Sequence, residues 1–185
     1  MRHLTLKQTE YALNMLALLG ISVILLMAFA FQFFWYELPC PLCLLQRVGF
    51  LLMGIGFLMN LRFGLHPVHY TLVLLSAVYT GFVALRQILL HIIPGTGDYG
   101  SAIFGLHMYT WSFIFVVLVI IATAVILGAS RQYETHSHFF AAYKKTCLLL
   151  ISLFFLIAVS NIASVWAECA WRACPDNPVT YVHTL

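Results

Sequence analysis

Charged residues are scarce in this sequence, and their scarcity limits what the protein can be. Lysine, arginine, aspartate and glutamate make up 8% of the 185 residues, whereas 63% are hydrophobic. An average soluble domain carries about 25% charged residues. So few charges cannot cover a water-exposed surface, which excludes a soluble globular enzyme and a disordered protein. The net charge is only +3, so no nucleic-acid partner is expected.

Long apolar stretches with few charges take the place of a polar surface. About 20 apolar residues cross the roughly 30 Å of membrane hydrocarbon as a helix. Five such helices are expected, at 11–36, 42–61, 68–93, 106–129 and 146–167. The stretches are continuously apolar rather than alternating, which argues against a β-barrel. The sequence therefore predicts an all-α polytopic membrane helix bundle, one domain over 1–185 in contact with lipid. The first stretch is too long for a signal peptide, and we expect it to be retained.

The basic residues predict the orientation of the bundle, because they concentrate in cytoplasmic loops. If the chain crosses five times, six of them lie on one side: Arg2, Lys7, Arg62, Arg131, Lys144 and Lys145. The amino terminus is therefore expected in the cytoplasm and the carboxyl terminus outside. Arg47 and Arg86 lie near the outer membrane level, against this bias, which suggests that each has a specific role.

Five cysteines form two close pairs and one single residue. Cys40 and Cys43 lie in Cys-Pro-Leu-Cys at the outer start of the second expected helix, and Cys169 and Cys174 follow the fifth. Both pairs thus fall on the outer face, where disulfides persist. Structural staples are one interpretation, but disulfides that close so few residues constrain little chain. Redox-active disulfides are the favoured interpretation. The lone Cys147 is expected to be a small apolar packing residue.

The sequence around Cys40 and Cys43 favours thiolate chemistry. Pro41 suits the first position of a helix, so both thiols lie at a helix amino end, whose dipole favours negative charge. Arg47 follows Cys43 by four residues and shares its helix face. It could stabilise a thiolate or polarise an oxygen of a bound oxidant. The alternative is an arginine that extends to the membrane surface.

Arg86 and His91 form a second candidate group, near the outer end of the third expected helix. An arginine within a membrane helix is a functional candidate by default. The alternative is a structural role, with bonds to polar groups of a neighbouring helix, and for His91 both interpretations stay open. Tyr109 and Trp111, which open the fourth expected helix, are typical of the aromatic belt at a membrane surface.

The segment Pro39-Cys-Pro-Leu-Cys-Leu-Leu-Gln-Arg47 closely resembles the start of the second helix in the DsbB family of disulfide bond formation proteins. Arg86 with His91 and the Gly105-Leu106 opening of the fourth helix extend the resemblance over four helices. The resemblance implies a DsbB-like four-helix core and an inner-membrane, quinone-dependent thiol oxidase. Such a protein reoxidises a periplasmic, thioredoxin-fold DsbA-type thiol oxidase and passes two electrons to ubiquinone or menaquinone.

The resemblance also implies a role for each candidate residue. Cys43 is the thiol nearest the quinone, and Cys40 exchanges with the second cysteine pair. Arg47 holds or polarises the quinone, with Arg86 and His91 as further cofactor-binding candidates. The active face is periplasmic, and no metal is expected.

The position of the second pair departs from the better-known family members. Those have four helices and carry the pair between the third and fourth, where residues 94–105 contain no cysteine. The tail from Cys174 resembles that of a five-helix branch, and a fifth crossing returns it to the face of the first pair. The expected relay runs from a reduced partner to Cys169–Cys174, then to Cys40–Cys43, then to quinone.

Three other functions fit parts of the sequence. A copper-type metal-handling membrane protein could use Cys-x-x-Cys, because thiolates bind Cu(I). However, no row of intramembrane cysteine or methionine marks a transport path. Outward transfer of reductant would need a thiol pair reachable from the cytoplasm, where only Cys147 lies. A structural membrane subunit would leave the outer cysteine pairs and Arg47 unexplained.

Overall fold

The computed structural model describes residues 2–93, 97, 99–129, 142–170, 172, 174, 178, 180 and 181. Five long helices make up most of this part: α1 (Arg2–Phe34), α2 (Pro41–Phe63), α3 (Pro67–His91), α4 (Met108–Ala129) and α6 (Lys144–Cys169). Each contains a stretch of 21 to 27 residues that is long and apolar enough to cross a membrane. The predicted all-α polytopic membrane bundle is confirmed.

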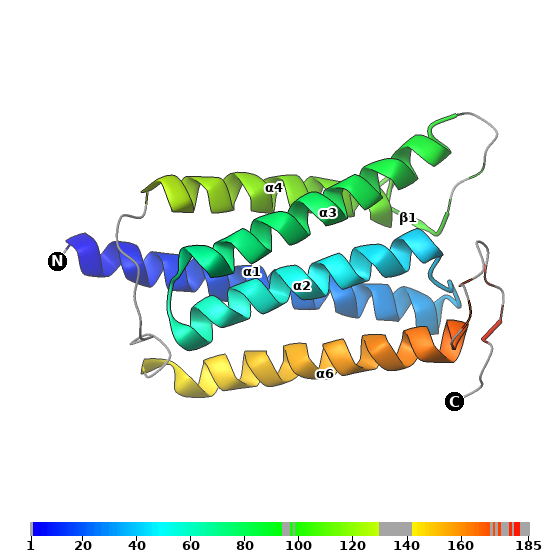
Figure 1. Cartoon of the computed structure of the whole chain (residues 1–185). Coiled ribbons are helices and arrows are strands. Elements are labelled where there is room, and N and C mark those ends of the chain that lie inside the picture. Colours follow the sequence, from blue (N-terminus) through cyan, green and yellow to red (C-terminus); the bar gives the residue numbers. More distant parts are fainter. Residues whose placement is uncertain are drawn as a thin grey trace.

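The helices run side by side, and α2 lies among them (Figure 1). It packs against α1, α3 and α6, while α3 also packs against α4. The start of α2 and the end of α6 lie at the same end of the bundle. This end carries Cys40, Cys43, Cys169 and Cys174, and we call it the cysteine end.

The segment before α4 differs from the sequence-based expectation. Leu106 and His107, expected to open a helix, form the short strand β2 (Leu106–His107), which pairs antiparallel with β1 (Ala102–Ile103). Phe104 and Gly105 make the two-residue turn, with φ of 51° and 78°. Two successive positive φ values are typical of tight hairpin turns, and glycine adopts them without strain. The hairpin takes the place of the first turn of the expected helix.

Small residues let α2 approach its neighbours closely. A Cβ atom added at Gly56 would lie 2.6 Å from Cγ2 of Val73 on α3, and one at Gly54 would overlap the ring of Phe154 on α6. Membrane helices commonly use small residues in this way, because lipid provides no hydrophobic drive for helix association. Two faces of α2 are therefore fixed against separate helices.

A buried polar cluster joins α1, α2 and α3 at the end opposite the cysteines. Asn60 Nδ2 donates to Asn14 Oδ1 at 2.9 Å, and Asn14 Nδ2 donates to the Tyr70 hydroxyl at 2.7 Å. His69 Nδ1 lies 3.1 Å from Asn60 Oδ1. Unbonded polar groups are costly in hydrocarbon, so these bonds favour one register of the three helices. That register sets which side chains meet at the cysteine end.

Candidate active site

Cys40 and Cys43 form a disulfide at the amino end of α2. Cys40 caps the helix, since its Sγ accepts a hydrogen bond from the backbone N–H of Cys43 at 3.2 Å. Pro41 occupies the first helical turn, where its missing N–H costs nothing. Cys40 is buried and Cys43 is half-buried. The helix dipole favours negative charge on sulfur at this position.

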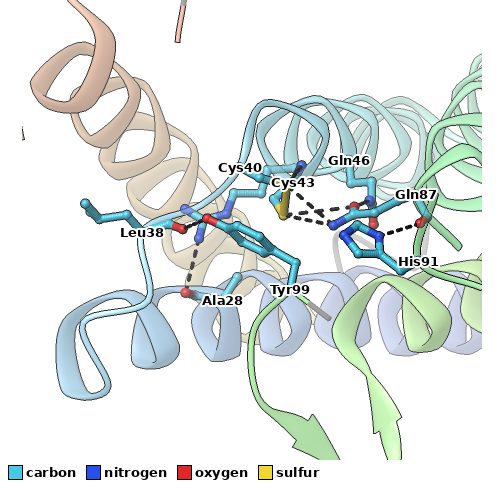
Figure 2. The surroundings of a disulfide bond; sticks show 9 residues. Ala28, Leu38, Cys40, Cys43, Gln46, Gln87, His91 and Tyr99 are labelled. Atoms are coloured by element: carbon cyan, nitrogen blue, oxygen red, sulfur yellow. Dashed lines mark hydrogen bonds between the residues drawn. A yellow bond between two sulfur atoms is a disulfide. The ribbon is translucent and has the colours of Figure 1, made fainter. Parts of the chain in front are cut away.

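Gln87 of α3 faces this disulfide, although the sequence analysis did not single it out (Figure 2). Its Nε2 donates to Sγ of Cys40 at 3.4 Å and to Sγ of Cys43 at 3.5 Å. Its Oε1 accepts from Nε2 of Gln46 at 2.7 Å. Gln87 is 0% exposed. An amide within an apolar span was the available signal, because a polar group in hydrocarbon needs a partner.

Arg47 turns into the bundle and is only 7% exposed. Its Nη1 donates to Oε1 of Gln32 at 2.9 Å, and its Nη2 donates to the carbonyl oxygen of Ala28 at 3.1 Å. The guanidinium carbon lies 5.4 Å from the ring centroid of Phe29. These contacts with α1 hold the side chain inside the bundle, away from the membrane surface.

Gln32 connects Arg47 to the fifth helix and to the tail. Its Nε2 donates to Oγ of Ser164 on α6 at 2.8 Å and to the hydroxyl of Tyr181 at 3.0 Å. Gln32 is 2% exposed. The arginine beside the first disulfide and the helix that carries the second are thus joined by one side chain.

Glu168 is a second charged residue in this region that the sequence analysis missed. It is 1% exposed, and within the described part of the chain neither carboxylate oxygen has a hydrogen-bond partner. It lies one turn after Ser164 on α6, and its charge acts on Arg47. The fifth helix was expected to end at 167, so Glu168 counted as a loop residue. The observed helix continues to Cys169 and buries it.

A pocket of about 100 Å³ opens beside Cys43 and Arg47. Its walls come from α1, α2, α3 and α4 and from the segments before α2 and β1. The lining residues are mostly apolar, and they are Ile24, Leu25, Ala28, Phe31, Glu37, Leu38, Pro39, Cys43, Gln46, Arg47, Phe50, Gln87, Tyr99, Gly100, Met108, Tyr109 and Ser112. An engineered apolar cavity of about 150 Å³ accepts benzene. At about 100 Å³ the pocket is smaller than that cavity, so it has room for one ring at most.

Tyr99 forms part of the pocket wall, and its hydroxyl donates to the carbonyl oxygen of Leu38 (Figure 2). Burial raises the pKa of Tyr99 to about 12, and the nearby carboxylates of Glu168 and Glu37 add to this effect. The phenol therefore stays protonated at neutral pH and can keep donating to Leu38.

The two candidates on α3 lie outside the pocket lining. His91 stacks on Tyr109, with ring centroids 5.4 Å apart, and its Nδ1 lies 2.8 Å from the carbonyl oxygen of Gln87. His91 thus contacts two residues that line the pocket, Tyr109 and Gln87, without lining the pocket itself. Arg86 is exposed. Adjacent residues of a helix point about 100° apart, so when Gln87 faces the disulfide Arg86 points elsewhere.

Cys169 and Cys174 form a second disulfide at the cysteine end, where α6 finishes. Cys169 is 3% exposed, whereas Cys174 is half-buried. Cys147, the one free cysteine in the described part, is buried near the start of α6. Three or more histidine, cysteine or acidic side chains grouped as for a metal ion do not occur among the described residues.

Comparison with known families places the first cysteine pair in a recognised segment. Residues 10–98 match the family described as Disulfide bond formation protein DsbB. Comparison with curated proteins and with solved structures gave no match. The matched segment contains Cys40, Cys43, Arg47 and Gln87, and it ends before α4 and the second pair. Residues 10–98 are thus similar to the DsbB family, and this similarity supports a role in disulfide bond formation.

Proposed function

We propose that this protein is an inner-membrane thiol oxidase that reoxidises a periplasmic DsbA-type dithiol oxidase and passes the electrons to a quinone. One observation carries the proposal: the Cys40–Cys43 disulfide lies at a ring-sized pocket that Cys43 and Arg47 both line. A disulfide that served only as a staple would gain nothing from such a pocket.

The proposed orientation places the cysteine end in the periplasm. Arg62 lies in the last turn of α2, and Lys144 and Lys145 lie in the first turn of α6, so all three are at the opposite end. The positive-inside rule assigns that end to the cytoplasm. Both disulfides then face the compartment in which disulfides are formed and kept.

The second disulfide is the proposed entry point for electrons. Cys174 is more exposed than Cys169, so a partner thiolate reaches its Sγ first. Attack forms a mixed disulfide and releases Cys169 as a thiolate. The partner's second thiolate then displaces Cys174. The resulting dithiol reduces Cys40–Cys43 by the same exchange, with one S–S bond formed and one broken at each step.

The residues around Cys43 fit a quinone ring. Apolar side chains form most of the wall, and Arg47 supplies a cation at one side. A guanidinium has five N–H donors, so Arg47 can bond Gln32 and Ala28 and still donate to a ring oxygen. A bound quinone supplies the oxidising power that the side chains lack.

An adjoining apolar groove suits the isoprenoid tail of such a quinone. The groove has a volume of about 320 Å³, and its walls come from α1, α4 and the β1–β2 hairpin. It shares the lining residues Ile24, Met108 and Ser112 with the pocket, so the two lie next to each other. Trp111 and Phe115 on α4 and Met27 on α1 also line it.

Quinone reduction by the purified protein tests this function, with a reduced DsbA-type protein as the electron donor. We expect turnover with ubiquinone or menaquinone in the unaltered protein. Cys43→Ala and Cys174→Ala should each abolish it, because each breaks one step of the relay. Cys147→Ala is the matched control, since Cys147 is buried away from both pairs, and it should retain turnover.

The same assay separates the rival outcomes. Turnover that survives Cys174→Ala would keep the oxidase but remove the second pair from the relay. The absence of turnover with either quinone in a folded protein would contradict the proposed function.

A further inference from the structure

One amide of α3 contacts both sulfurs of the first disulfide. Gln87 Nε2 lies 3.4 Å from Sγ of Cys40 and 3.5 Å from Sγ of Cys43, each within hydrogen-bonding distance for sulfur. The side chain is 0% exposed, so water does not compete for these bonds. Figure 2 shows the amide directed at the disulfide from the neighbouring helix.

The orientation of this amide follows from its partners. A disulfide sulfur carries no hydrogen and can only accept, so an amide oxygen facing it would lack a donor. The opposite side of the amide meets Gln46, whose Nε2 donates to Oε1 of Gln87 at 2.7 Å. Gln46 therefore holds the Gln87 oxygen toward itself, 4.0 Å from Cys43 Sγ, and leaves the nearer N–H groups to the sulfurs.

Opening the disulfide creates a charge that needs such a donor. An incoming thiolate forms a new S–S bond with one sulfur, and the electron pair of the Cys40–Cys43 bond leaves on the other as a thiolate. A buried anion is costly unless hydrogen bonds stabilise it. Cys40 Sγ accepts a hydrogen bond from the backbone N–H of Cys43 at 3.2 Å, and this bond would stabilise a thiolate on Cys40. Cys43 is the leaving sulfur when Cys40 is attacked, and its described donor is Gln87.

We infer that Gln87 is a catalytic residue of the disulfide exchange, with its carboxamide N–H donating to the Cys43 thiolate as the Cys40–Cys43 bond opens. The inference deepens the proposed oxidase function, but it concerns only the first pair. It therefore holds for any thiol reductant, including a small dithiol, which is oxidised to its own disulfide as the pair gains two electrons and two protons.

The test measures the first pair alone and needs neither quinone nor a partner protein. Cys147, Cys169 and Cys174 are replaced by alanine, and the protein is reduced with dithiothreitol. The rate of alkylation by iodoacetamide is then followed against pH, and the balance between disulfide and dithiol is measured in dithiothreitol buffers. Gln87→Met keeps a similar length but removes the N–H donors. Ser76→Ala is the control, because Ser76 is buried on the same helix and far from the cysteines.

We expect Gln87→Met to move the alkylation profile to higher pH by about one unit. The variant loses a hydrogen bond to the charged form of the sulfur, which disfavours that form. The dithiol should therefore be disfavoured about tenfold, which lowers the reduction potential by about 30 mV for a two-electron couple. Ser76→Ala should match the parent protein in both measurements.

A second variant covers the case in which Gln87→Met does not fold. Gln87→Leu also removes the N–H donors and adds no group that can ionise or donate, so it should disfavour the dithiol to a similar extent. If the folded variants match the parent in both measurements, the inference is overturned. Since neither measurement involves quinone, a shifted profile without quinone turnover would contradict only the proposed oxidase.

Discussion

Nη1 of Arg47 donates to Oε1 of Gln32 at 2.9 Å, so the arginine at the pocket is oriented by the first helix. The same amide donates to Ser164 of α6 and to Tyr181 of the tail. Gln32 lies within the DsbB-like segment, whereas Ser164 and Tyr181 lie outside it. One side chain thus ties the fifth helix and the tail to the pocket.

Gln32→Leu should therefore remove the hydrogen bonds that hold the Arg47 side chain and the tail at Tyr181 in place. Removal of one partner from a buried polar pair costs about 1–3 kcal/mol, and more when the remaining group is charged. We expect a lower unfolding temperature in detergent and faster proteolysis of the tail near Tyr181. Gln8→Leu on the exposed face of α1 is the control and should change neither. Equal stability and equal proteolysis of the two variants would show that the network does not hold the tail.

Arg47 and Arg86 can be compared directly, because the structure places only one of them at the pocket. Arg47→Lys keeps the charge but loses the planar set of donors that bonds Gln32 and Ala28. We expect KM for quinone to rise roughly tenfold, since a charge-assisted hydrogen bond contributes about 1.5–3 kcal/mol. Exchange between the partner and the second pair, measured by alkylation without quinone, should stay unchanged.

Arg86→Lys tests the sequence-based prediction that Arg86 also binds the cofactor. Because Arg86 is exposed and the substitution keeps its charge, we expect KM for quinone to change by less than about threefold. A rise as large as that of Arg47→Lys would support the prediction that Arg86 binds the cofactor.

The sequence predicted the parts of this site that depend on local pattern. Five apolar spans, the helix start at Pro41 and the shared face of Cys43 and Arg47 all follow from spacing along one helix. Spacing could not show which polar residue of α3 meets the disulfide. Arg86 was the stronger candidate from sequence, because it is a charged residue within a membrane helix. The rotation of α3 about its axis instead brings Gln87 to the sulfurs.

Gln32 and Gln87 were missed for one reason, which is that their partners lie far away in the sequence. Gln32 bonds Ser164 across 132 positions, and Gln46 bonds Gln87 across 41. Such pairs depend on how the helices pack, which composition and periodicity do not encode. Glu168 was missed for a simpler reason, because the expected helix ended one residue before it.

The contact between α2 and α6 predicts an asymmetry between two glycine substitutions. A Cβ at Gly54 would overlap the ring of Phe154, which is 3% exposed and has little room to move. Gly54→Ala should cost about 1–3 kcal/mol by overpacking. A Cβ at Gly128 meets nothing within 4 Å, so Gly128→Ala should be neutral or stabilising by up to about 1 kcal/mol.

Thermal unfolding of the two variants in one detergent measures this difference. Adding Phe154→Leu to Gly54→Ala should recover part of the loss, because the smaller side chain makes room for the methyl group. A Gly54→Ala protein as stable as Gly128→Ala would mean that α2 and α6 are not in close contact.

Tyr99 predicts a loss of stability at high pH. Its pKa is raised from 10.0 to about 12, first by burial and then by the charges of Glu168 and Glu37. The folded protein thus keeps the phenolic proton to a higher pH than the unfolded chain does. Below pH 10 both states are protonated and the contribution is fully present. As the pH rises from about 10 to about 12, the unfolded chain ionises first, so stability falls.

Tyr99→Phe removes the ionisable group, so its unfolding temperature should fall less steeply than that of the unaltered protein between pH 10 and 12. The variant should start from a lower value at pH 9, because the hydrogen bond to the Leu38 carbonyl is lost. Tyr36→Phe is the matched control, since Tyr36 is 86% exposed, and it should follow the unaltered protein at every pH. Parallel curves for Tyr99→Phe and the unaltered protein would show that the Tyr99 hydroxyl is not buried against Leu38. In that case the wall of the pocket on this side would be open to water, and a quinone ring held there would be less shielded than we propose.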